Sequence, residues 1–136
     1  MIQDNLNLIR EGLAALNRRD TEGMLATLHP EVQLEPLRAV LEGSSYAGHE
    51  GFREWLRHMQ EDWEEQSVDL QDVKALPSGQ ALVEAVLHVR YRGSGVEVAA
   101  AGAWLCDFRD GVVSRIRFYR DSESAIEAAT RPELEG

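Results

Sequence analysis

The most constraining feature of this sequence is a stretch near its carboxyl-terminal end, residues 97–129, which reads EVAAAGAWLCDFRDGVVSRIRFYRDSESAIEAA. Two runs of alternating apolar and polar residues flank the segment Arg109-Asp110-Gly111, and this pattern predicts two antiparallel strands joined by a tight turn. Asp121 then precedes a short alanine-rich segment and predicts the N-cap of a helix. The rest of the chain must therefore supply the layer that covers one face of this hairpin.

The length of the turn decides which residues of the two strands share a face. A two-residue loop, Asp110-Gly111, would put Trp104 on the same face as the arginines of the following strand. A three-residue loop with Gly111 in the left-handed conformation shifts the register by one residue. The second alternative separates apolar from polar residues, so we predict that register. Its apolar face carries Trp104, Cys106, Phe108, Ile116 and Phe118, and its polar face carries Asp107, Arg109, Arg115 and Arg117.

Three helices are predicted upstream of the sheet. Apolar residues recur at helical spacing in residues 3–18 and again in residues 49–65, and each segment predicts an amphipathic helix. Between them, Asp20 or Thr21 is expected to cap a short helix that carries Leu28 and stops at His29-Pro30. The apolar face of the third helix carries Phe52, Trp55, Leu56, Met59 and Trp63.

Five strands are predicted around these helices. Residues 32–36 alternate and end at a proline, which indicates a short edge strand that carries Glu35 near its end. Longer strands are expected at residues 67–76, 80–92 and 97–108, and the last strand is expected to end at Tyr119. This order of elements indicates an α+β fold. We expect one domain over residues 1–130 and a frayed tail at residues 131–136.

Composition limits the class of function. With 43% hydrophobic and 28% charged residues, the 136-residue chain is typical of one globular domain with a core. Its formal net charge of −10 argues against a nucleic acid or an anionic membrane as partner, because a negative field repels phosphates. Cys106 is the single cysteine and cannot form an internal disulfide, and no segment reads as a signal peptide or membrane span. We therefore expect a cytoplasmic protein.

The histidines do not predict a metal site. His29, His49, His58 and His88 lack the spacing of zinc ligands. We therefore expect no metal.

Three motifs along the chain resemble one superfamily. They are LHPEVQLEP, YAGHEGFREWL and RDGVVSRIRFYRDSESAIEAA. With the order of elements, they resemble the SnoaL-like branch of the nuclear transport factor 2 superfamily, which includes ketosteroid isomerases, limonene epoxide hydrolases and scytalone dehydratases. The resemblance covers almost the whole chain. It implies a cone-shaped α+β barrel in which three N-terminal helices pack on a strongly curved, mostly antiparallel sheet, followed by a short C-terminal helix.

The resemblance also implies two catalytic positions. Glu35 resembles the place of the proton-shuttling carboxylate of a ketosteroid isomerase, and Asp121 resembles the acid/base residue of SnoaL-type cyclases. The isomerase's second acid falls near Trp104, and its first-helix tyrosine has no counterpart in residues 3–18. From the residues alone, Glu35 could be a solvent-facing glutamate and Asp121 a helix cap.

An apolar molecule held in the cone would contact the aromatic stripe and the apolar sheet face. The predicted ligand-binding residues are Tyr46, Trp55, Met59, Trp63, Tyr91, Trp104, Cys106 and Phe118. Apolar residues at regular spacing also form cores, so the alternative is that these side chains fill the interior themselves.

The opposite face of the sheet suits association. Ala99, Ala101 and Ala103 lie there beside His88, and the resemblance implies a homodimer through this surface. A solvated face is the alternative.

Three hypotheses of function follow. The first is an enzyme that moves a proton on an apolar or polycyclic molecule, with Glu35 as general base assisted by Asp121. It would catalyse isomerisation, dehydration, cyclisation or epoxide opening without a metal or organic cofactor. The second is a pocket that binds an apolar small molecule without converting it. The third is a dimerisation module with a filled interior.

Overall fold

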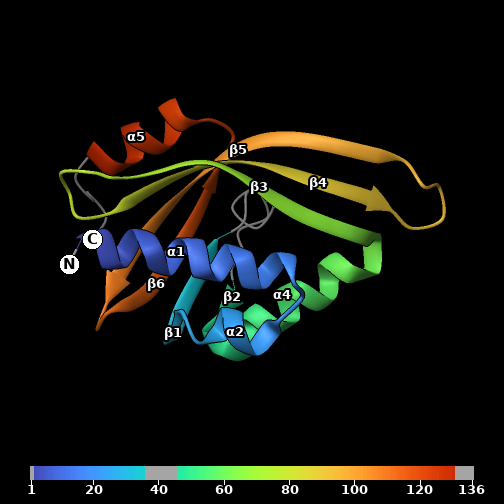
Figure 1. Ribbon diagram of the computed structural model, residues 1–136, viewed down its shortest axis with the longest axis horizontal. Coiled ribbons are helices and arrows are strands. Elements are labelled where there is room, and N and C mark those ends of the chain that lie inside the picture. Colours follow the sequence, from blue (N-terminus) through green and yellow to red (C-terminus); the bar gives the residue numbers. More distant parts are fainter. Residues whose placement is uncertain (1, 36–45, 131–136) are drawn as a thin grey trace.

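A computed structural model of the chain describes residues 2–35 and 46–130, and the tail expected at residues 131–136 lies outside the described residues. The helices in this part are α1 (Ile2–Asn17), α2 (Thr21–Leu25), α4 (Gly48–Asp62) and α5 (Ser122–Thr130). The strands are β1 (Leu28–Glu35), β2 (Tyr46–Ala47), β3 (Trp63–Ala75), β4 (Ala81–Tyr91), β5 (Glu97–Arg109) and β6 (Val112–Tyr119). The fold is therefore α+β, as predicted, with helices packed on one sheet (Figure 1).

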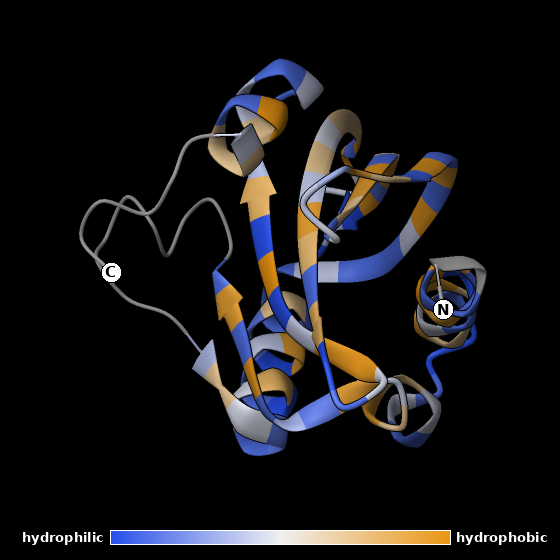
Figure 2. Ribbon diagram, turned by 90° about the vertical axis from the view of Figure 1, so that its left-hand side faces the viewer, coloured by the Kyte–Doolittle hydropathy of each residue, from blue (hydrophilic) through white to orange (hydrophobic). Residues whose placement is uncertain are grey.

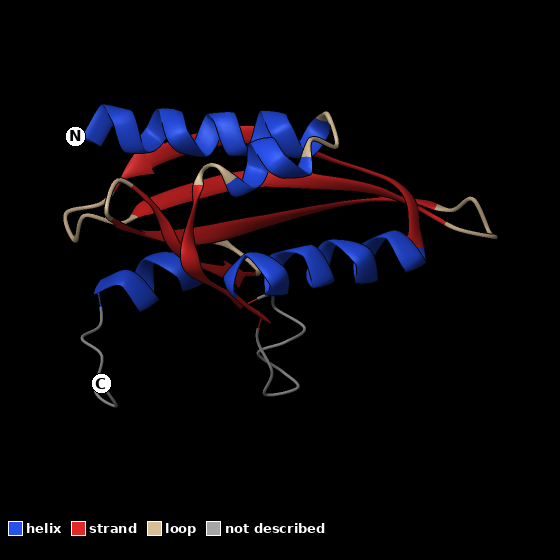
Figure 3. Ribbon diagram, turned by 90° about the horizontal axis from the view of Figure 1, so that it is seen from below, coloured by secondary structure: helices blue, strands red, loops and turns tan. Residues whose placement is uncertain are grey.

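The strands form a six-stranded sheet in the order β2-β1-β6-β5-β4-β3. β1 runs parallel to β6, and the other neighbouring strands pair antiparallel. The sheet curves around the helical side of the molecule, and bands of opposite hydropathy alternate along its strands (Figure 2). α1 and α5 lie on opposite sides of the sheet (Figure 3).

The concave face of the sheet holds the main core. Buried side chains of α1, α2 and α4, among them Ile9, Met24 and Phe52, pack there against buried residues of the strands such as Val83. The convex face is covered in part by α5, whose Ala125 packs with Leu82 and Ala103. Alternating strand residues thus meet two different helical layers.

The helical hairpin at the amino end agrees with its sequence signals. Asp20 is the N-cap of α2, and its carboxylate accepts a hydrogen bond from the backbone N–H of Gly23 at 3.0 Å. After α1 ends at Asn17, Arg19 adopts the left-handed region at φ 60°, and the N–H of Asp20 donates to the carbonyl of Ala15. α2 is shorter than predicted, because Leu28 already begins β1.

Trp63 was predicted on the third helix and lies instead at the start of β3. α4 ends at Asp62, and Trp63 has extended backbone angles, φ −117° and ψ 127°. Trp63 pairs with Tyr91 of β4, and their rings meet edge to face. Cross-strand packing of two aromatic residues outweighs the weak helical preference of tryptophan.

The prediction that the first strand is an edge strand was wrong. β1 lies between β2 and β6 and pairs with both. Its register with β6 is interrupted between Leu28 and Gln33, and Pro30 lies in that interruption. A proline is tolerated there because it has no backbone N–H to donate, and the interrupted pairing does not need one at this position.

The β5–β6 turn differs from the predicted one, although the predicted faces are correct. Asp110 and Gly111 both have positive φ, 56° and 81°, and Arg109 pairs with Val112, so the loop has two residues. Ser114 then forms a bulge, an extra residue in β6 without a partner in the register of β5. The bulge returns the apolar residues of β6 to the same face as those of β5. As a result, the apolar residues stay on one face, although Trp104 pairs with Phe118 and not with Ile116 as the predicted loop would require.

No helix in the described part of the chain is both long enough and apolar enough to cross a membrane.

Candidate functional site

An apolar pocket lies between the concave face of the sheet and the helices. Its volume is about 80 Å³. α1 and the loop after α2 contribute side chains to its wall, α4 contributes Phe52 and Trp55, and the strands contribute Leu34, Trp104, Cys106, Ile116 and Phe118. We call this space the apolar pocket.

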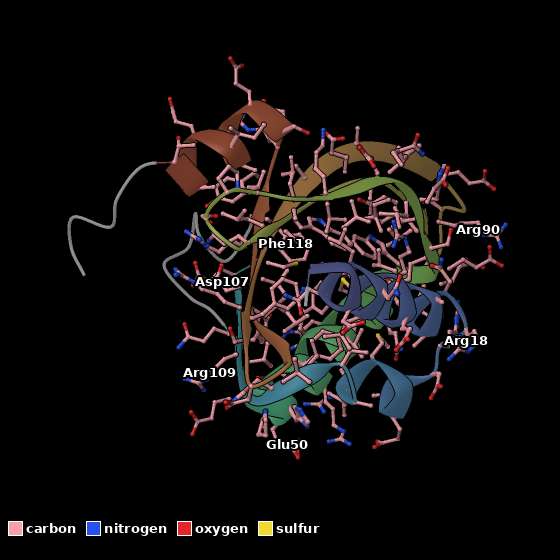
Figure 4. The ribbon with its side chains drawn as sticks, turned by 60° about the vertical axis from the view of Figure 1, so that its left-hand side comes forward. Arg18, Glu50, Arg90, Asp107, Arg109 and Phe118 are labelled. Atoms are coloured by element: carbon pink, nitrogen blue, oxygen red, sulfur yellow. The ribbon has the colours of Figure 1, made fainter. Side chains whose placement is uncertain are left out.

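The aromatic residues of the wall form a continuous series of ring contacts along the pocket. The ring of Phe52 lies 5.5 Å from that of Trp55, Trp55 lies 5.9 Å from Phe118, and Phe118 lies 5.1 Å from Trp104, measured between centroids. Tilted and edge-to-face contacts of this kind fix ring positions. Phe118 faces the helical side of its strand, whereas Asp107 and Arg109 extend on the other side (Figure 4).

Polar groups are scarce in this wall. The hydroxyl of Thr27 donates to the carbonyl of Met24 at 2.7 Å, so it is already paired. A Cβ at Gly12 would lie 3.1 Å from the Thr27 hydroxyl, and the missing side chain therefore lets α1 approach this loop. An apolar molecule fits such a wall without leaving polar groups unpaired.

Cys106 is the titratable residue of the wall. Burial, and to a lesser degree the charge of Asp107, raises the pKa of its thiol to about 12. The thiol therefore stays protonated near neutral pH and is a poor nucleophile. Cys106 thus contributes to the wall as a small apolar group.

Glu35 was expected to enter the cone, and the structure places it differently. Its neighbour Leu34 lines the apolar pocket, so Glu35 lies on the opposite face of β1. There its carboxylate accepts a hydrogen bond from Nε of Arg115 at 2.9 Å. β1 lies beside β6 in the sheet, and Arg115 of β6 is therefore close enough to pair with this carboxylate. The carboxylate is thus engaged on the face away from the apolar pocket.

Asp121 is exposed and acts as a helix cap. Its carboxylate accepts a hydrogen bond from the backbone N–H of Ser124 at 2.8 Å. That hydrogen bond is the main cause that lowers the pKa of Asp121 below its ordinary value of 3.8. A lowered pKa suits a charged cap better than a group that exchanges protons near neutrality.

The predicted ligand-binding residues separate into two groups. Trp55, Trp104, Cys106 and Phe118 line the apolar pocket. Of the other residues, Met59 packs against the core, the hydroxyl of Tyr46 lies 3.0 Å from Nδ1 of His58, Tyr91 is exposed, and Trp63 lines a different pocket.

Sequence reasoning missed the contribution of α1 to the pocket. Leu8, Ile9, Leu13 and Leu16 line it together with Gly12. The helical spacing of the leucines and isoleucine was visible, and the glycine among them was a signal of close helix approach. The ligand contacts predicted from the sequence all lie in the later elements, from Tyr46 onward.

Within residues 2–35 and 46–130, no group of three or more His, Cys, Asp or Glu side chains gathers in a way that could hold a metal ion.

Comparison with protein families identifies a match over most of the chain. The SnoaL-like domain family matches residues 9–116. No curated protein matches the chain.

Solved structures share the fold. TerC, co-crystallised with polyporic acid, is 21% identical with a TM-score of 0.77, and the alignment covers 94% of this chain and 99% of that chain. An NTF2-like protein of unknown function from Burkholderia pseudomallei is 21% identical with a TM-score of 0.76, over 94% and 98% of the two chains. A Mycobacterium tuberculosis protein in complex with estradiol-17beta-hemisuccinate is 20% identical with a TM-score of 0.74, over 88% and 95%.

Proposed function

The chain belongs to the SnoaL-like domain family, and from that premise we propose that it binds an apolar small molecule in the apolar pocket. The observation that carries the proposal is the wall itself, in which aromatic and aliphatic side chains surround a space of about 80 Å³. Moving apolar surface from water into such a space is favourable by roughly 25 cal/mol per Å². The complexes of TerC with polyporic acid and of the M. tuberculosis protein with estradiol-17beta-hemisuccinate support this reading.

Toluene is a suitable probe because it is small and wholly apolar, and the flexible side chain of Met24 in the wall can move to admit its ring. A ligand that binds the folded state alone raises the melting temperature. We expect saturating toluene to raise the melting temperature of the wild-type protein. Ile116→Phe should remove this shift, because the new ring would occupy the pocket. The matched control is Ile126→Phe, since Ile126 is exposed on α5.

The control variant should keep the wild-type response to toluene. An equal response in Ile116→Phe and wild type would place the binding site elsewhere and reject the proposal.

A narrower form of the proposal is proton transfer on the bound molecule, with Glu35 as general base and Asp121 assisting. It requires the Glu35 carboxylate to leave Arg115 and reach the pocket, because a base must lie within hydrogen-bond distance of the proton it takes. Isomerisation, dehydration, cyclisation and epoxide opening are the reactions in question. For a molecule that the protein converts, Glu35→Gln should abolish turnover and leave the response to toluene intact. Retained turnover would reject the role of Glu35.

We also propose that two copies associate through the convex face of the sheet. Beside α5, this face exposes His88, Ala99 and Ala101. Small residues on paired strands allow a second sheet to approach closely. Association would leave the apolar pocket on the concave side of each copy.

A further inference from the structure

The size of the apolar pocket limits what it can hold alone. Its volume is about 80 Å³. A dry cavity that takes up benzene measures about 150 Å³. Even a single aromatic ring therefore requires side chains of the wall to move, and a ring that carries a chain requires additional space.

That space lies behind Leu16 and Met24, which line both the apolar pocket and a second pocket of about 140 Å³. We call it the arginine pocket. Its polar and aromatic wall consists of Arg19, Thr21, Gln60, Trp63, Gln66 and Arg92. Its residue Arg19 directly follows Arg18, which Figure 4 labels at the end of the molecule away from Asp107.

The two arginines of this pocket are held by backbone carbonyls. Nη2 of Arg19 donates to the carbonyl of Glu64 at 3.1 Å, and Nε of Arg92 donates to the carbonyl of Gln60 at 2.7 Å. Each guanidinium keeps further N–H donors, because each of these bonds uses one of them. The guanidinium groups are thus positioned without being neutralised.

Several carboxylates near this pocket are paired with other arginines. Asp20 forms an ion pair with Arg18, and Glu22 forms one with Arg53. Arg90 forms ion pairs with Glu64, Glu65 and Glu97. Among the residues that the structure describes, neither Arg19 nor Arg92 forms an ion pair with a carboxylate. The wall that the described residues give the arginine pocket thus holds two guanidinium groups and no carboxylate, in a chain whose net charge is −10.

Gln66 adds a polar group without a partner. Its Oε1 is buried and has no hydrogen-bond partner in the described part of the chain. A side-chain amide can present either its oxygen or its NH2 group to a pocket. Gln66 can thus accept from a ligand hydroxyl or donate to a ligand carboxylate.

We propose that the arginine pocket binds the anionic group of an amphipathic ligand whose apolar part occupies the apolar pocket. The ligand class is an apolar acid, with a carboxylate or similar oxyanion that receives N–H bonds from Arg19 and Arg92. The ligand passes between the pockets past Leu16 and Met24, and the unbranched, flexible side chain of Met24 can move to admit it. This inference rests on the proposed function and extends it by naming the polar end of the ligand.

The test compares 4-phenylbutanoate with 4-phenylbutanamide, which share the ring and the chain and differ in charge. Calorimetric titration should give the wild-type protein a tighter dissociation constant for the carboxylate by about tenfold or more. Arg19→Gln and Arg92→Gln should each remove most of that preference and leave the affinity for the amide unchanged. Arg57→Gln is the matched control, because Arg57 is exposed on α4 outside both pockets.

The amide reports on the apolar pocket and on the integrity of each variant. If the wild type binds both probes equally, or if the Arg19 and Arg92 variants keep the preference, the inference is overturned while the proposed function stands. If the wild type binds neither probe, the proposed function is contradicted, and the inference fails with it.

Discussion

Single side chains decide which chemistry the interior of this protein can support. The thiol of Cys106 faces the apolar pocket, but burial raises its pKa to about 12 and keeps it protonated. Glu35, the carboxylate that sequence placed nearest, is paired with Arg115 on the other face of the strand. Side-chain chemistry therefore favours binding in the apolar pocket, and catalysis by Glu35 stays a prediction.

Asp121 provides a pH-dependent prediction at this scale. Its folded-state pKa lies below the ordinary value of 3.8, so its stabilising effect is present above that value and is lost as the pH falls through the folded-state pKa. Asp121→Ala should lower the melting temperature at pH 7, because α5 loses its N-cap. The deficit should shrink as the pH is lowered below 3.8.

The measurement is thermal unfolding of wild type and variant across this pH range. Asp69→Ala, a change at an exposed aspartate of β3, is the control. A deficit that is independent of pH would contradict the assigned role of the Asp121 charge.

Among the elements, the β5–β6 hairpin shows how sequence can predict faces while missing a turn. The separation of apolar from polar residues is correct because burial strongly penalises a one-residue slip. The predicted turn was wrong because two arrangements give the same alternation of apolar and polar residues. One is a three-residue loop, and the other is a two-residue loop followed by a bulge. The positive φ of Asp110 and the bulge at Ser114 identify the second.

Deletion of Ser114 tests this element. The deletion removes the extra residue opposite Asp107 and leaves the pair Trp104 and Phe118 in place, so the protein should fold with its aromatic contacts intact. Insertion of one alanine between Ile116 and Arg117 should instead turn Phe118 to the convex face and unfold the protein. Near-ultraviolet circular dichroism and thermal unfolding distinguish the outcomes. An unfolded deletion variant would show that the bulge itself is required.

Other elements were predicted less well for reasons that are long-range. Trp63 joins β3 because Tyr91 lies opposite it, and no local signal at Trp63 reports a partner so distant in sequence. β1 is an inner strand because β6 pairs with it in parallel, which the sequence of β1 does not encode. That same pairing brings Arg115 to Glu35, so an error in strand order became an error in the candidate site.

For the molecule as a whole, the sequence and the family agree on the fold, since the SnoaL-like domain family matches residues 9–116 and solved structures share the fold. The position of the arginine pocket was not predictable. Arg19 and Arg92 are distant in sequence and line the same pocket because the residues after α1 and after β4 both lie beside the junction of α4 and β3.

Association of two copies is the prediction at this scale. Ala101→Glu places a charge in the middle of the proposed interface and should shift the protein from dimer to monomer in sedimentation velocity. The control is Ser94→Glu in the exposed turn between β4 and β5, which should not alter the sedimentation coefficient. An unchanged dimer in Ala101→Glu would assign association to another surface.

The most direct test of the account is a crystal structure of the protein with 4-phenylbutanoate bound. The account predicts that the phenyl ring lies among Trp55, Trp104 and Phe118. Density for the ring on the convex face or on the outer surface, with the apolar pocket empty, would contradict it.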